Sequence, residues 1–85
     1  MQQFPNQQVK TRKPVLVFLK IVGPPLVFYV DDSEALYNEV RQIITNANEQ
    51  SPKLIEKIGK GPLKKVSVLD TQIAGVAIQE ETFTA

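Results

Sequence analysis

The sequence predicts an α+β domain, a mostly antiparallel sheet of four or five strands with one helix packed on one face. Two pairs of apolar, β-branched segments, each pair split by turn residues, predict two hairpins, and one amphipathic segment between them predicts a helix. At 85 residues, the chain can bury only one small core. With a further strand near the C-terminus, the predicted order is β-β-α-β-β-β.

The first hairpin is predicted from residues 15–19 and 26–30. Both segments are rich in Val, Leu and Phe, and Gly23, Pro24 and Pro25 separate them. β-Branched and aromatic side chains favour strands, whereas proline lacks the amide donor that an internal ladder position needs. The two prolines therefore belong to the connection or to the first position of the second strand.

The helix is predicted over residues 33–48. The preceding and first residues, 31–34, are Asp, Asp, Ser and Glu, which supply N-caps and acidic groups at the positive end of the helix dipole. Apolar residues then recur at helical spacing, at Leu36, Val40, Ile43 and Ala47. Pro52 follows and prevents the helix from continuing.

A second hairpin is predicted from residues 53–58 and 63–69, with a turn at residues 59–62. The last strand covers residues 72–80. Its apolar residues Ile73, Val76 and Ile78 do not share one face of a regular strand, because strand side chains alternate with a period of two. An extra residue at Ala74 or Gly75, a β-bulge, would place them together.

The ordered domain is predicted to span residues 14–80. Residues 1–13 hold four glutamines and few large apolar side chains, so we expect a flexible Gln-rich arm. Residues 81–85 are expected to be a frayed tail. The N-terminus lacks the basic and apolar regions of a signal peptide, and no apolar run reaches the length of a transmembrane helix, which predicts a cytoplasmic protein.

The amino-acid composition excludes most kinds of catalytic site. The chain has no Cys, His or Trp, so thiolate nucleophiles, imidazole bases and the usual zinc sites are absent. Helix capping accounts for the acidic cluster Asp31, Asp32 and Glu34, and the turn at residues 59–62 lacks the spacing of a phosphate-binding loop. We therefore predict a protein that is not an enzyme and that needs no cofactor or metal.

The first hairpin is predicted to carry a protein interface. Neither of its strands alternates apolar with polar residues, so both faces need cover, and one helix can shield only one face. The alternatives are closure into a small barrel, or a sheet that tolerates exposed aliphatic side chains. Either set of alternating residues can face outward: Leu16, Phe18, Val27 and Tyr29, or the set on which we place the interface, Val15, Val17, Leu19, Phe28 and Val30.

A rival prediction is a small nucleic-acid-binding module. Ten Lys and Arg against nine Asp and Glu give a net charge of only +1, but lysines concentrate in the second hairpin and three basic residues lie in the arm. These groups would contact phosphates. A solubilising rim around the turn also explains the lysines and is the interpretation that we favour. The possible phosphate contacts are Lys53, Lys57, Lys60, Lys64 and Lys65.

Three stretches of the sequence are similar to segments of a known protein family. They read DDSEALYNEV at residues 31–40, SPKLIE at 51–56 and KKVSVLDTQIAGVAI at 64–78. In this order they resemble a family of small uncharacterised proteins of cyanobacteria and algal plastids, over residues 14–80. The resemblance implies a ββαβββ-like fold and a phototroph's cytoplasm or plastid stroma, and it brings no catalytic or binding residues. The apolar first hairpin itself predicts a non-enzymatic interaction or accessory module, a homodimer or a component of a larger assembly, and the resemblance adds only the phototroph setting.

Overall fold

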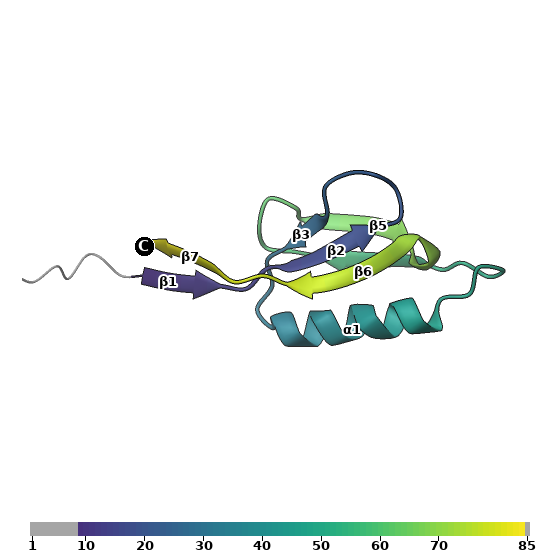
Figure 1. Ribbon diagram of the computed structural model, residues 1–85, viewed down its shortest axis with the longest axis horizontal. Helices are drawn as coiled ribbons and strands as arrows, with labels where there is room; N and C mark the ends of the chain where they lie inside the picture. The colour runs from purple at the N-terminus through teal and green to yellow at the C-terminus, as the bar shows by residue number, and fades with distance from the viewer. Residues whose placement is uncertain (1–8, 85) are drawn as a thin grey trace, which may run out of the picture.

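Seven strands and one α-helix make up residues 9–84, the part of the chain that the computed structural model describes (Figure 1). The predicted α+β class is confirmed. The helix is too short and too polar to cross a membrane. In chain order the elements are β1 (Val9–Arg12), β2 (Val15–Leu19), β3 (Leu26–Phe28), α1 (Ser33–Asn46), β4 (Leu54–Ile58), β5 (Lys65–Leu69), the 3-10 turn η1 (Asp70–Gln72), β6 (Ile73–Ile78) and β7 (Glu81–Thr84).

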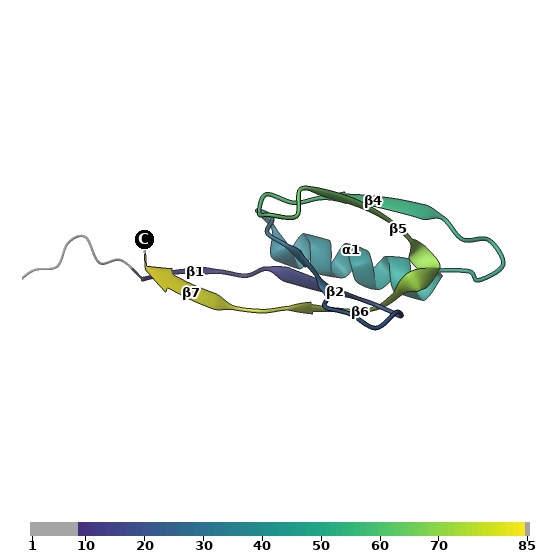
Figure 2. The ribbon, with the colours of Figure 1, turned by 90° about the horizontal axis from the view of Figure 1, so that it is seen from above.

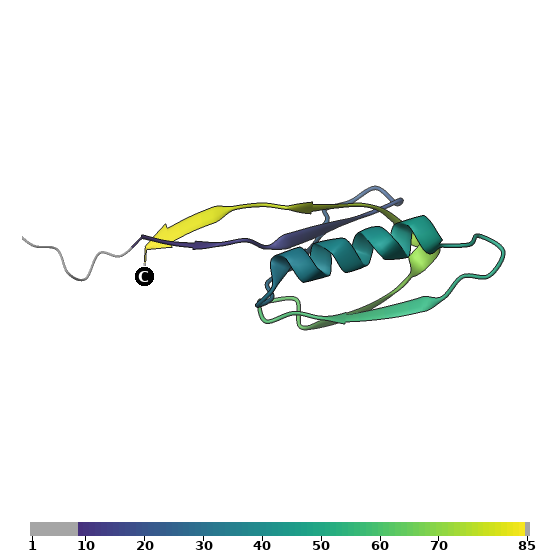
Figure 3. The same cartoon turned by 90° about the horizontal axis from the view of Figure 1, so that it is seen from below.

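Every strand pairing is antiparallel, but the strands form three small sheets instead of one sheet of four or five. One sheet has the order β3-β2-β6, and the hairpin β4-β5 and the ribbon β1-β7 are two-stranded. The β4-β5 hairpin lies across the core from the β3-β2-β6 sheet, and α1 runs between them along one side (Figures 2 and 3). Val66 and Val68 of β5 pack against the same core as β2 and β6, so the hairpin acts as a second wall.

The core is formed by six apolar residues from the β3-β2-β6 sheet and the helix, and partly buried residues of β5 pack against them. The inward-facing residues of β2 alternate along the strand, as the period of two requires. Leu36 and Val40 lie four positions apart on α1 and so project from the same face of the helix. The buried residues are Val15, Val17, Phe28, Leu36, Val40 and Ile73.

The predicted β-bulge is confirmed in β6. Phe18 is opposite Gly75, whereas its neighbour Leu19 is opposite Ile73, so Ala74 is the extra residue. The insertion reverses the alternation at that point and turns Ile73 to the buried side, together with the inward-facing Val76 and Ile78.

Two segments predicted to lie outside the ordered domain are paired strands. Residues 9–12 of the arm form β1 and residues 81–84 of the tail form β7. Their ladder continues that of β2 and β6 in the same register, with a Gln79 N–H to Pro14 carbonyl hydrogen bond of 3.0 Å at the junction. The ribbon therefore prolongs the sheet, and it projects beyond the N-terminal end of α1 (Figure 1). Residues 1–8 of the predicted arm lie outside the described residues.

Asp70 closes the open end of the second hairpin, where it pairs with Lys53 in the register of β4 and β5. Its carboxylate accepts a 2.9 Å hydrogen bond from the amide of Lys53, and its own amide donates to the Lys53 carbonyl at 2.8 Å. The side chain is buried, and this exchange satisfies it within the protein. The start of β4 is thus held beside the η1 turn that leads into β6.

The N-terminus of α1 is fixed by Asp32. The Asp32 carboxylate accepts a 3.0 Å hydrogen bond from the amide of Ala35, one of the donors that a helix start leaves unpaired. The helix ends at Asn46, two residues before the predicted end, because Ala47 already adopts an extended conformation.

Replacing Asp32 by Ala removes this cap and should lower the free energy of unfolding by about 1 kcal/mol, as measured by urea denaturation. Asp31→Ala is the matched control, because Asp31 pairs with Lys60 on the surface and does not cap the helix. A loss for Asp31→Ala as large as that for Asp32→Ala would contradict the assignment of the cap.

Candidate protein interaction site

The strand register decides which face of the first hairpin is available. Val15 is opposite Phe28 and also opposite Ile78, and this face looks toward α1. Val15, Val17 and Phe28 are 0%, 3% and 1% exposed. Leu19 and Val30 are partly buried and pack against the same cluster.

The predicted interface on Val15, Val17, Leu19, Phe28 and Val30 is therefore wrong: three of these residues belong to the core and the other two pack against it. Both faces of the hairpin are apolar, so hydrophobicity does not distinguish them. The position of α1 makes the choice. The Ser33 hydroxyl, in the first turn of the helix, donates a hydrogen bond to the Lys13 carbonyl, so the start of the helix is held beside the start of β2.

The alternative set of residues points away from the core. Leu16 is opposite Val27 on one side and Ala77 on the other, and Phe18 is opposite Gly75. We call the surface formed by Leu16, Phe18, Val27, Gly75 and Ala77 the outer face. None of these residues is charged, and α1 and the β4-β5 hairpin lie behind the opposite side of the sheet (Figure 2).

Phe18 is the most prominent group on the outer face. Its ring passes over Gly75, where an added Cβ would lie 3.9 Å from Phe18 Cδ2. The side chain remains 40% exposed, because glycine and alanine beside it offer little lateral cover. The loop that follows β2 adds two further exposed apolar residues, Ile21 and Val22.

A cluster centred on Tyr29 ties the β1-β7 ribbon to the sheet. The Tyr29 hydroxyl donates to the Glu81 carboxylate at 3.2 Å, and Arg12 Nε bonds the same carboxylate at 3.2 Å. The Arg12 guanidinium carbon lies 4.8 Å from the centre of the Tyr29 ring and 4.6 Å from that of Phe83, within cation–π range. This cluster was not predicted, because its members come from three segments that are distant in the sequence.

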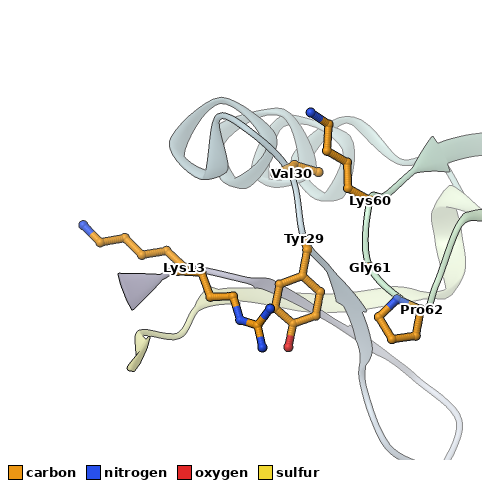
Figure 4. Close-up of a pocket in the computed structure, with 7 residues that line it drawn as sticks. Lys13, Tyr29, Val30, Lys60, Gly61 and Pro62 are labelled. Atoms are coloured by element: carbon orange, nitrogen blue, oxygen red, sulfur yellow. The ribbon is translucent and has the colours of Figure 1, made fainter. Parts of the chain in front are cut away.

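A cleft of about 450 Å³ lies beside Tyr29, and three cations contribute to its wall: Arg12, Lys13 and Lys60. The cations do not converge. Figure 4 shows the side chains of Lys13 and Lys60 extending in different directions away from the ring. Lys60 reaches Asp31 at 2.6 Å, and Arg12 is bound to Glu81. The cleft therefore lacks the convergent charge that a bound phosphate would require.

The lysines of the second hairpin do not form one cationic patch. Lys57 pairs with Glu39, Lys60 with Asp31 and Lys65 with Glu56. Lys57 and Lys65 also lie on opposite faces of the hairpin, because Lys65 is opposite Ile58, the residue next to Lys57. Lys53 and Lys64 are exposed beside this paired group. The arrangement matches a solubilising rim better than a phosphate-binding surface.

No cluster of His, Cys, Asp or Glu among residues 9–84 is placed to hold a metal ion. No protein-family model matches the chain, and comparisons with curated proteins and with solved structures give no match. The resemblance to a cyanobacterial and plastid family stays a prediction, and the function has to be argued from the outer face itself.

Proposed function

We propose that the protein is a non-enzymatic interaction module that self-associates by packing the outer face of one copy against the outer face of another. The observation that carries this proposal is the asymmetry of cover on the β3-β2-β6 sheet. Both sides are apolar, yet α1 and β5 pack against one side only. At about 25 cal/mol per Å² of apolar area, covering the other side would contribute several kcal/mol.

A second copy is the partner that this surface fits best. In a twofold contact the same surface forms both halves of the interface, so a patch of one charge would repel itself. The outer face has no charged residue among its five members. It also combines one protruding ring, Phe18, with the low surface at Ala77, which favours interdigitation of two identical sheets.

The cellular location that we propose for the module depends on the family resemblance alone. Membership of the cyanobacterial and plastid family would put the assembly in a phototroph's cytoplasm or plastid stroma, as an accessory component. The rival nucleic-acid function receives less support, because three of its five lysines are already paired with carboxylates.

Phe18→Asp tests the proposed contact, because it places a charge at the most exposed position of the outer face and should halve the molar mass in solution. The measurement is light scattering coupled to size-exclusion chromatography, with circular dichroism to verify the fold. Ile58→Asp is the matched control: Ile58 is 67% exposed, but on the outside of the β4-β5 hairpin, across the core from the outer face. An unchanged mass for Phe18→Asp, or a wild-type monomer at high concentration, would refute self-association through the outer face.

A further inference from the structure

The β1-β7 ribbon has a main-chain edge that is suited to pairing. Pro14 and Gln79 share a hydrogen bond, so in an antiparallel ladder of constant register the pairs Arg12–Glu81 and Lys10–Phe83 are also hydrogen-bonded pairs. The residues between these hydrogen-bonded pairs direct their main-chain N–H and C=O groups away from the partner strand. Thr82 and Thr84 therefore present N–H and C=O groups at the free edge of β7, and Val9 and Thr11 do so at the free edge of β1.

The ribbon also lacks cover. It projects past the end of α1, so the helix shields neither of its faces (Figure 3), and Val9 is 74% exposed. A two-stranded ribbon in water is marginally stable without a further strand or a packed face. The cluster around Tyr29 holds only the end nearest the sheet, through Arg12 and Glu81.

The two edges differ in their protection against pairing. β1 carries Lys10 and Arg12, and cations on an edge strand disfavour the addition of another strand. β7 consists of Glu, Thr, Phe and Thr, residues that favour strands except for Glu81, and Glu81 is already bound by Arg12 and Tyr29. The edge of β7 is therefore the one open to a partner.

We infer that β7 pairs antiparallel with β7 of a second copy, about a twofold axis at Phe83. In this register the two Phe83 residues form a non-hydrogen-bonded pair, where side chains approach most closely, and each Thr82 exchanges hydrogen bonds with the opposite Thr84. No charged side chains face each other within residues 82–84. The two ribbons become one four-stranded sheet in the order β1-β7-β7-β1.

The symmetry of this contact links it to the outer face. A twofold axis perpendicular to the sheet leaves the outer faces of both copies on the same side. The proposed face-to-face contact has its twofold axis parallel to the sheet, and so perpendicular to the axis of the β7 contact. If the two axes intersect, the two contacts together form a closed tetramer, a dimer of dimers. The tetramer rests on the proposed function, whereas the β7 pairing does not.

Thr82→Pro tests the pairing directly. The proline removes an amide that points to the free edge and leaves the β1-β7 hydrogen bonds in place, a position where strands tolerate proline. Thr82→Pro should halve the molar mass, and Thr82→Pro combined with Phe18→Asp should reduce it to one quarter of the wild-type value. Thr11→Pro is the matched control, because Thr11 is the cross-strand partner of Thr82 and its amide lies at the other edge.

A disulfide provides a second readout, since the chain contains no cysteine. Phe83→Cys should form an intermolecular disulfide under mild oxidation, because the two sulfur-bearing residues face each other across the axis. Thr11→Cys should remain largely reduced. A mass unaffected by Thr82→Pro, or equal cross-linking at positions 83 and 11, would overturn the β7 pairing. If Phe18→Asp still halved the mass, the outer-face proposal would stand without it.

Discussion

Phe28→Ala is expected to lower the free energy of unfolding by about 3–5 kcal/mol, which is a large fraction of the about 5–15 kcal/mol that stabilises a typical domain. Phe28 is 1% exposed and faces Val15 across the β2-β3 pair. The turn after β4 closes over it, because an added Cβ on Gly59 would lie 3.4 Å from Phe28 Cδ1. Neighbours on both sides are held in place by main-chain hydrogen bonds, so the cavity has little scope to collapse. Urea denaturation followed by circular dichroism measures the loss.

Phe18→Ala is the control on the opposite face of the same sheet. The ring is 40% exposed and lies over Gly75, so its removal leaves no internal cavity and should cost about 1 kcal/mol or less. Both variants have to be compared at the same low protein concentration, because association adds to apparent stability. If Phe18→Ala were as damaging as Phe28→Ala, the assignment of inner and outer faces would be wrong.

Most of the secondary structure was predictable, because it depends on local patterns. Both hairpins follow from β-branched segments around proline and glycine, and the helix follows from its cap and its apolar spacing. Even the bulge at Ala74 was predictable, since Ile73 is out of phase with Val76 and Ile78 in a regular strand. In each case the period of the side chains carries the information.

The buried face of the first hairpin was not predictable in the same way. Leu16 and Phe18 are as apolar as Val15 and Val17. The strand therefore has the same hydrophobic pattern whichever of its two faces is buried. The choice depends on where α1 docks. That position depends on contacts between distant parts of the chain, such as the packing of Leu36 and Val40 in the core with residues of β2.

The β1-β7 ribbon and the pairing of the lysines were missed for a related reason. Residues 9–12 are too polar to predict as a strand by themselves, and their partner strand lies at the other end of the described chain. Lys57 and Lys60 are neutralised by Glu39 and Asp31, which belong to α1 and the segment before it. Composition within one segment contains no information about partners that only the fold brings together.

Gly61→Ala should be the second most damaging change, with a loss of about 1–3 kcal/mol from overpacking. A Cβ at this position would lie 2.3 Å from Tyr29 Cδ2, far inside contact distance, so the ring has to move. Its displacement would break the hydrogen bond from the Tyr29 hydroxyl to Glu81 and separate the ring from Arg12. The ribbon would then lose the side-chain contacts that hold it to Tyr29, and hydrogen exchange of the β1 and β7 amides should accelerate more than that of β2.

A double-mutant cycle isolates this contact. Gly61 does not have a positive φ, so alanine fits its backbone conformation and the ring of Tyr29 is the main obstacle. In a Tyr29→Ala background the obstacle is gone, and Gly61→Ala should be close to neutral, or slightly stabilising because alanine restricts the unfolded chain. An equal loss from Gly61→Ala in both backgrounds would show that the turn itself, and not its contact with Tyr29, requires glycine.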